Sequence, residues 1–164
     1  GIIHLEKGLS FKSLKLSKVM QNCEDIICFI ATIGSGIEKA ISRFTKQNRL
    51  LDAYVLESMG SMAVESMVDK FCKDMEKTLN AQNKGTTLRF SPGYCDWPIA
   101  EQKKLFRIFD PKQIKVSLND SCLMHPRKSI SGVFGIYPFH GNSTFSPYNP
   151  CSECTKKACT ARRA

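Results

Sequence analysis

Apolar residues recur at intervals of three and four over residues 49–79, the longest periodic stretch of the chain. This spacing places them on one face of a helix, so the sequence predicts a long amphipathic helix here. Gly60, Ser61 and Ala63 interrupt the apolar positions, and small residues within a helix often mark the close approach of a backbone or a ligand. Glu65 follows at the edge of the apolar face, a place typical of a solvated carboxylate.

Two stretches rich in β-branched and aromatic residues, 26–33 and 129–137, predict strands that lie far apart in the sequence. Glycines inside the second stretch indicate close contact with a ligand or another backbone. Alternation gives that strand two faces, one with Ile130, Gly132, Phe134 and Ile136 and the other with Ser129, Ser131, Val133, Gly135 and Tyr137.

Shorter patterns complete the expected architecture. They are a helix or loop-plus-helix over 1–22, a helix over 37–47, a strand over 86–90, a helix over 99–109 and strand pieces at 115–118 and 121–124. Asp96 is placed to cap the helix that follows it. Strands that follow helices and pair locally favour an α+β fold with an antiparallel sheet. We expect one domain over residues 1–139 and an irregular, Cys-rich basic tail over 140–164.

Composition narrows the class of protein. A chain of 164 residues with 42% hydrophobic and 24% charged residues is typical of one globular domain. No apolar run is long enough for a membrane span, and the first residues lack the pattern of a secretion signal. Eight cysteines without such a signal indicate reduced thiols. We therefore expect a cytoplasmic protein without a membrane partner.

The net charge of +9 lies almost entirely in the second half of the chain, where residues 83–164 carry +8 and residues 1–82 carry +1. A basic half can face nucleic acid, a phosphate-bearing ligand or an acidic protein. The sequence has no long Lys/Arg block and no paired aromatic strands of the kind that bind RNA, which disfavours nucleic acid.

The segment from Arg89 to Pro98 joins a stiff backbone to a single guanidinium. Pro92 and Pro98 fix φ, whereas Gly93 permits backbone conformations closed to other residues. Arginine offers a planar fork that pairs bidentately with a carboxylate, so the segment suits a small carboxylate-bearing ligand. An ordinary strand-to-helix connection with a solvent-facing arginine is the alternative.

Three cysteines in the tail, Cys151, Cys154 and Cys159, lie within nine residues. Thiolates at this spacing suit zinc or an iron–sulfur cluster, and a complete site needs a fourth ligand such as His140 or Cys95. The alternative is an ordinary reduced tail that binds no metal.

Four short motifs follow one another along the chain. They are Ala63-Val64-Glu65 on the long helix, Arg-Phe-Ser-Pro-Gly-Tyr at 89–94, the stretch at 117–126 and Ser-Ile-Ser-Gly at 129–132. In this order they resemble the reactivation domain of cobalamin-dependent methionine synthase. The resemblance covers about residues 50–138. It implies a C-shaped α+β domain with a curved antiparallel sheet flanked by helices.

In that family the domain binds S-adenosylmethionine and presents its methyl group to a cobalamin, which is thereby reactivated by reductive methylation. The resemblance implies that Arg89 pairs with the ligand carboxylate and that Glu65 pairs with its ammonium or balances its sulfonium. Phe134 stands where the family has a contacting tyrosine. The implied ligand-binding set is Glu65, Arg89, Ser91, Gly93, Tyr94, Ser131, Gly132 and Phe134, with no catalytic residue.

The resemblance also implies partners. The chain has no Asp-x-His-x-x-Gly motif for cobalamin, so the cobalamin would lie on a corrinoid-binding protein or a cobalamin-dependent methyltransferase. We therefore expect a free-standing relative that supplies the S-adenosylmethionine site to a methyltransferase system, together with an electron-donor protein. An iron–sulfur cluster in the tail would serve as an electron port.

Two alternatives stay open at this stage. One is a ligand-free docking module for a corrinoid protein, because Phe134 lacks the tyrosine hydroxyl and residues 1–48 contain no match to the family segment that supplies an aspartate. The other, less favoured, is a basic nucleic-acid-binding domain, whose signature would be a steep salt dependence of binding.

Overall fold

The computed structural model describes residues 1–138, 148–155 and 157–159. Residues 139–147, 156 and 160–164 are not described, so the expectation for His140 falls outside the described chain. Within the described residues, no helix combines the length and the apolar character needed to cross a membrane.

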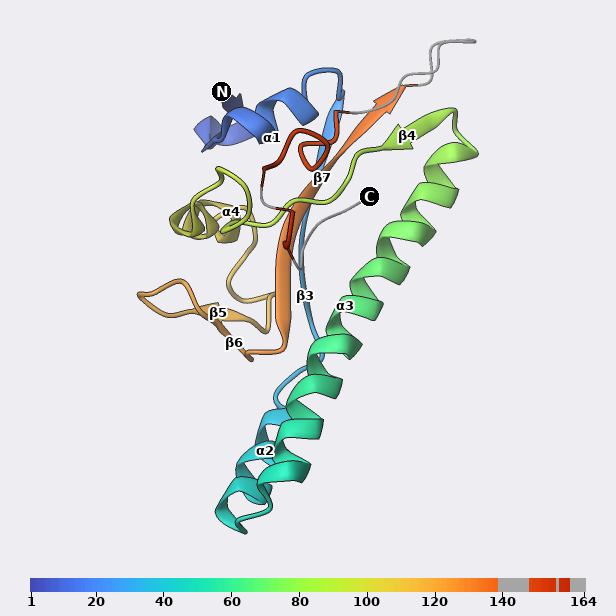
Figure 1. The fold of residues 1–164 in the computed structure, drawn as a ribbon. Helices are drawn as coiled ribbons and strands as arrows, with labels where there is room; N and C mark the ends of the chain where they lie inside the picture. The colour runs from blue at the N-terminus through green and yellow to red at the C-terminus, as the bar shows by residue number, and fades with distance from the viewer. Residues whose placement is uncertain (139–147, 156, 160–164) are drawn as a thin grey trace.

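The centre of the fold is a three-stranded antiparallel sheet (Figure 1). Its strands are β3 (Asp25–Thr32), β7 (Ser129–Pro138) and β4 (Lys84–Thr86), with β7 in the middle. The register pairs Phe29 with Gly132 and Thr86 with Ile136. Two small hairpins lie apart from it, β1 (Ile2–His4) with β2 (Ser10–Lys12) and β5 (Ser117–Leu118) with β6 (Met124–His125). The predicted α+β class with antiparallel pairing is confirmed.

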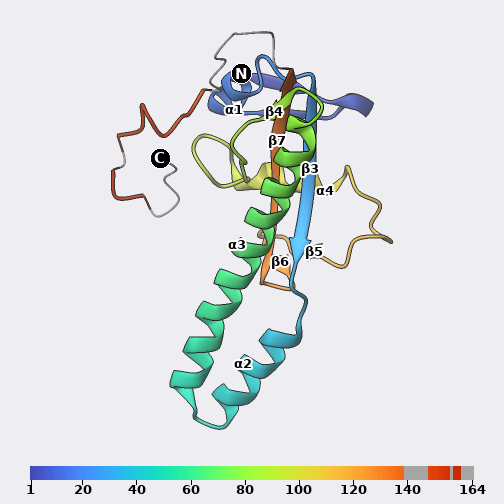
Figure 2. The same cartoon turned by 90° about the vertical axis from the view of Figure 1, so that its right-hand side faces the viewer.

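Helices cover the two faces of this sheet (Figures 1 and 2). The helix α3 (Leu50–Asn80) has 31 residues and runs along one face, and its hairpin with α2 (Gly36–Lys46) extends past the end of the sheet. At about 1.5 Å per residue, α3 is roughly 45 Å long. The other face carries α1 (Leu14–Val19), α4 (Gln102–Phe106) and the short 3-10 helix η2 (Ile99–Glu101). A second 3-10 helix, η1 (Glu6–Gly8), connects β1 to β2.

The strand β7 divides the core into two clusters, as its alternating side chains predict. On the α3 side, Phe134 packs with Phe29 and Val68. On the other side, Val133 packs with the fully buried Phe11, Leu16, Trp97 and Leu105 among others. The strand β7 is therefore buried along nearly its whole length.

The N-terminal segment differs from its prediction. A helix or loop-plus-helix was expected over residues 1–22, but only α1 is α-helical and it follows the β1–β2 hairpin. Strands of three residues are too short to show an alternating pattern, so the sequence carries no signal for them. The hairpin is held by tertiary packing, since Phe11 of β2 is fully buried with its ring centroid 5.0 Å from that of Trp97.

The prediction that Asp96 caps the following helix is wrong, because Asp96 caps α1 instead. Its carboxylate accepts hydrogen bonds from Ser13 Oγ at 2.6 Å and from the Leu14 backbone N–H at 2.8 Å. Burial raises the pKa of Asp96, but these bonds and one from the Lys15 backbone together leave it lowered. The segment from Arg89 to Pro98 is therefore anchored at its far end by the N-terminal part of the chain.

Candidate ligand-binding site

Arg89 owes its position to its neighbour Phe90, which forms an isolated bridge with Val133 of β7. Each of these residues donates its backbone N–H to the other's carbonyl oxygen at 2.8 Å. The Phe90 side chain enters the core on the α1 side. Since successive side chains of an extended chain alternate, the Arg89 side chain extends the other way, toward α3.

Two carboxylates of α3 receive Arg89. Its Nη2 donates to Glu65 Oε2 at 2.5 Å and to Asp69 Oδ1 at 3.1 Å. Glu65 and Asp69 are four residues apart, which places them on the same face of the helix. Both carboxylates are half-exposed, whereas the Arg89 side chain is only 8% exposed. Sequence reasoning missed Asp69, although its spacing from Glu65 is a signal that could have found it.

One donor of Arg89 has no partner. Its Nε is buried and makes no hydrogen bond to any residue that the structure describes. A buried donor left unpaired costs about 1–3 kcal/mol, so an acceptor that reaches it stabilises the arrangement. The guanidinium is thus held in place through Nη2 while it retains unused binding capacity.

A cavity of about 1290 Å³ lies beside Arg89, against the start of β7. Below the bridge to Phe90, residues 129–132 pair only with β3 within the described chain, so the other edge of β7 is open. The cavity walls come from α3, the segment 88–95, the start of α4, the β5–β6 hairpin and the tail. Six of the residues predicted to bind ligand line it, namely Glu65, Arg89, Ser91, Gly93, Tyr94 and Ser131.

Gly132 and Phe134, also predicted to bind ligand, are not among the residues that line the cavity. A Cβ at Gly132 would lie 2.6 Å from the Phe90 carbonyl oxygen and 2.9 Å from the Phe29 ring, so glycine is needed for strand packing. Phe134 is buried among aromatic rings, with its centroid 6.2 Å from that of Phe71. Phe134 belongs to the core cluster between the sheet and α3, and Gly132 lies against Phe29 of the same cluster.

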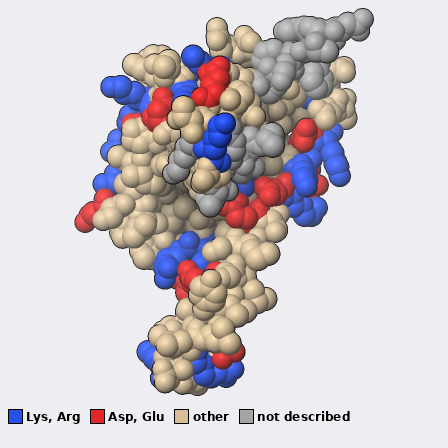
Figure 3. Space-filling model, viewed as in Figure 1, with Lys and Arg blue, Asp and Glu red and all other residues tan. Residues whose placement is uncertain are grey.

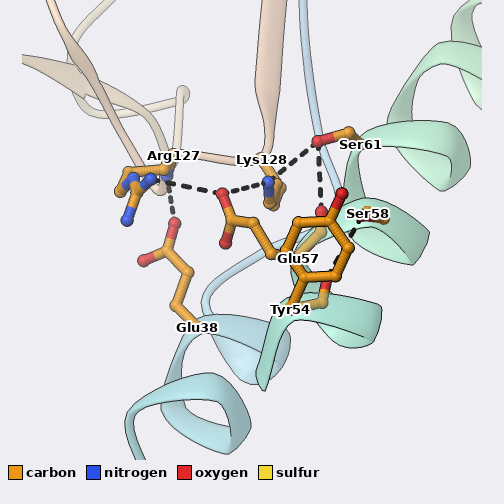
Figure 4. A network of polar contacts seen from close by, with 7 residues as sticks. All are labelled: Glu38, Tyr54, Glu57, Ser58, Ser61, Arg127 and Lys128. Carbon is orange, nitrogen blue, oxygen red and sulfur yellow. Dashed lines mark hydrogen bonds and ion pairs between the residues drawn. The ribbon is translucent and has the colours of Figure 1, made fainter. Parts of the chain in front are cut away.

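A second buried cation, Lys128, ties the turn before β7 to α3 (Figure 4). Its Nζ donates to Glu57 Oε1 at 2.7 Å and to Ser61 Oγ at 2.9 Å. The hydrogen bond from Lys128 is the main reason that the pKa of Glu57 is lowered. A Cβ at Gly60 would lie 3.2 Å from Lys128 Cε, so the small residues of α3 here admit the lysine stem.

The polar network continues into α2, because the Arg127 backbone N–H donates to Glu38 Oε1 and the Arg127 side chain pairs with Glu57 Oε1 at 3.2 Å (Figure 4). Charged and polar contacts therefore join the turn before β7 to both helices of the α2–α3 hairpin. Nothing in the sequence pattern indicated this network.

The cysteines of the tail lie along the same cavity. Cys151, Cys154 and Cys159 line it, and so does Cys95 of the segment after Arg89, whose pKa is raised mainly by burial. Among the described residues, no group of three His, Cys, Asp or Glu side chains is arranged to hold a metal ion. The prediction of zinc or an iron–sulfur cluster at these cysteines therefore gains no support from the structure.

Charge on the visible surface is mixed. On the face shown in Figure 3, Lys and Arg side chains of the described residues alternate with Asp and Glu and form no continuous basic area. Arg89 and Lys128 show why the net charge overstates the basic surface, because both are buried beside carboxylates of α3.

The fold and the cavity together define an α+β domain with a polar, partly charged site beside its central strand. A family model described as "Vitamin B12 dependent methionine synthase, activation domain" matches residues 16–145. The match spans most of the chain, which therefore belongs to this family. No curated protein sequence gives a significant match.

Family membership confirms the resemblance seen in the sequence motifs. It supports a role in the reactivation of cobalamin and implies association with a cobalamin-binding methionine synthase module. The matched range includes both helices of the α2–α3 hairpin, the whole central sheet and the segment that carries Arg89.

Proposed function

We propose that this protein binds S-adenosylmethionine in the cavity beside Arg89 and so serves the reductive reactivation of a cobalamin held by a partner protein. The observation that carries the proposal is Arg89 itself, a buried guanidinium that lines the cavity, is oriented by Glu65 and Asp69, and has an unpartnered Nε. Its fixed fork suits a ligand carboxylate.

The neighbouring charges suit the rest of an amino-acid group. S-adenosylmethionine carries an α-ammonium next to its α-carboxylate, so its recognition requires a cation and an anion side by side. Arg89 and Glu65 supply this pair, since both line the cavity and their charged groups are 2.5 Å apart. Glu65 is half-exposed, so its carboxylate remains accessible to an ammonium group while it orients Arg89.

The segment after Arg89 supports the ligand with a rigid backbone. The Gly93 N–H donates to the Trp97 carbonyl at 2.8 Å and the Tyr94 N–H donates to the Ser91 carbonyl at 3.2 Å, which closes the turn. Among the described residues, the N–H and hydroxyl of Ser91 have no such partner. Ser91 therefore offers donors to a ligand in the cavity.

The chemistry in this proposal belongs to the ligand, because S-adenosylmethionine supplies an electrophilic methyl group on its sulfonium. The protein holds the amino-acid end through Arg89 and Glu65 and contributes no nucleophile. In the reactivation system, the cobalamin and the electron donor lie on other proteins or modules.

The test is isothermal titration calorimetry with S-adenosylmethionine on the wild type and on Arg89→Ala. Loss of a desolvated charge pair costs about 2–4 kcal/mol, so we expect Arg89→Ala to bind roughly 30- to 1,000-fold more weakly. Arg107→Ala is the matched control, because Arg107 is exposed and lies outside the cavity. Absence of binding by the folded wild type, or equal binding by both arginine variants, would refute the proposal.

One observation favours a second function, that of a docking module without a ligand. Arg89 already has two carboxylate partners within the protein, and a structural ion pair needs no more. In that case a corrinoid protein would be captured equally well by the wild type and by Arg89→Ala, and calorimetry would detect no S-adenosylmethionine. Capture that requires both Arg89 and added S-adenosylmethionine would exclude it.

A further inference from the structure

Gln102, the first residue of α4, has a buried carboxamide at the wall of the cavity. The residue is 3% exposed and lines the cavity, yet its Nε2 has no hydrogen-bond partner among the residues that the structure describes. Three buried side-chain atoms of the described chain are unpartnered in this way, and two of them, Gln102 Nε2 and Arg89 Nε, belong to cavity residues. Buried amides are nearly always paired, so a partner from the cavity is expected.

The surroundings of Gln102 differ from those of Arg89. Tyr94, Ile99 and Leu123 line the cavity and are exposed despite their apolar side chains. Ile99 lies one helical turn before Gln102, and its Cδ1 is 3.3 Å from the position that a Cβ would take at Gly93. The cavity wall therefore offers apolar surface and a carboxamide in addition to the charges of Arg89 and Glu65.

Apolar lining residues next to a carboxamide suit the binding of a purine base. A flat ring system gains from apolar and aromatic contact on its faces, while its edge needs specific hydrogen bonds. A glutamine carboxamide carries a donor and an acceptor side by side, and it pairs bidentately with the 6-amino group and N7 of adenine. A ribose hydroxyl could also satisfy the Nε2 donor, but it would leave the exposed apolar side chains without a ligand surface.

We propose that Gln102 reads the edge of the adenine base and makes the cavity selective for adenine-containing ligands. The inference rests on the proposed function and extends it, because Arg89 anchors the amino-acid end of the ligand and Gln102 specifies the base. It assigns to Gln102 a role in specificity that neither the sequence motifs nor the family resemblance indicated.

The experiment compares S-adenosylhomocysteine with the analogue in which hydrogen replaces the 6-amino group of the base. Calorimetry gives Kd for each ligand with the wild type, with Gln102→Met and with the control Gln113→Met, since Gln113 is exposed and outside the cavity. One correct edge contact is worth about 1–3 kcal/mol, so we expect the wild type and the control to favour the 6-amino ligand by roughly 5- to 150-fold. Gln102→Met should bind both ligands with nearly equal Kd.

Methionine keeps the length of the side chain and removes the unpartnered amide, so Gln102→Met should fold with an unchanged or higher melting temperature without ligand. A folded Gln102→Met that retains the full preference for the 6-amino ligand would overturn the role of Gln102 and leave the proposed function standing. No binding of S-adenosylhomocysteine or S-adenosylmethionine by the wild type would overturn both.

Discussion

Arg89 and Lys128 are two buried cations that line the same cavity and pair with carboxylates of the same helix. The side chain of each is 8% exposed, and their partners Glu65 and Glu57 lie two helical turns apart on α3. The difference is that only Arg89 has a buried nitrogen atom with no hydrogen-bond partner among the described residues. Lys128 donates to both Glu57 and Ser61, and its stem packs across Gly60, whereas Arg89 keeps an unpartnered Nε.

This difference distinguishes a cation that only stabilises the fold from a cation that can also bind a ligand. An ammonium with two hydrogen-bond partners and a packed stem holds two elements together, in this case the turn before β7 and the α2–α3 hairpin. A guanidinium held through one nitrogen is oriented but not saturated. Proximity to the cavity therefore does not decide which cation serves a ligand, and a buried nitrogen atom without any partner is the more informative property.

The largest effect on stability should come from Lys128→Met, which leaves the Glu57 carboxylate without its main partner. Breaking a fully buried ion pair costs about 3–5 kcal/mol. Because Glu57 is still partly exposed and water can reach it, we expect a loss of about 2–3 kcal/mol in the free energy of unfolding. Urea denaturation measures this, with the exposed Lys103→Met as the matched control. A loss equal to that of the control would show that the ion pair between Lys128 and Glu57 contributes nothing to the free energy of unfolding.

A smaller effect is expected for Arg89→Met in the absence of ligand. Its carboxylate partners are half-exposed and remain hydrated after the substitution, and the unpartnered Nε is removed at the same time. We therefore expect a loss of about 1 kcal/mol or less by the same urea measurement. If Arg89→Met and Lys128→Met destabilised the protein equally, the distinction between the two cations would fail and the docking module would gain support.

The smallest effect is a pH dependence carried by Glu57. Its pKa is lowered from the usual 4.5 in the folded protein, chiefly by the hydrogen bond from Lys128, so its charged form favours folding. The stability it contributes is complete above pH 4.5 and is lost as the pH falls through the lowered pKa. Denaturation of the wild type and Glu57→Gln should differ near neutral pH and converge on acidification. A difference that stayed constant with pH would contradict this account.

Most of the fold could be predicted because its long elements carry local signals. The three- and four-residue spacing of α3 and the β-branched content of β3 and β7 are set by residues close in sequence, and these elements lie where they were expected. The β1–β2 hairpin and the cap from Asp96 to α1 could not be predicted, because they depend on contacts between residues far apart in the chain.

The candidate site could be predicted only in part, because some of its residues carry a local signal in the sequence and others do not. The chemistry of Arg89 and the family motifs indicated one wall of the cavity, and six of the predicted residues line it. The motifs also indicated Gly132 and Phe134, which are not among the residues that line the cavity. The burial of Gln102 and Lys128 has no local signal, since each polar side chain is enclosed by elements that come together only in the folded protein.

The antiparallel pairing of β3 with β7 has a consequence for synthesis on the ribosome. β3 is complete at Thr32, and its partner begins only at Ser129. At about 5–20 residues per second, the apolar strand waits roughly 5–20 s for the chain that pairs with it. An unpaired apolar strand edge is prone to aggregate. The α2–α3 hairpin emerges within that interval, and since α3 packs against β3 in the finished fold, it is the first element able to shield the strand.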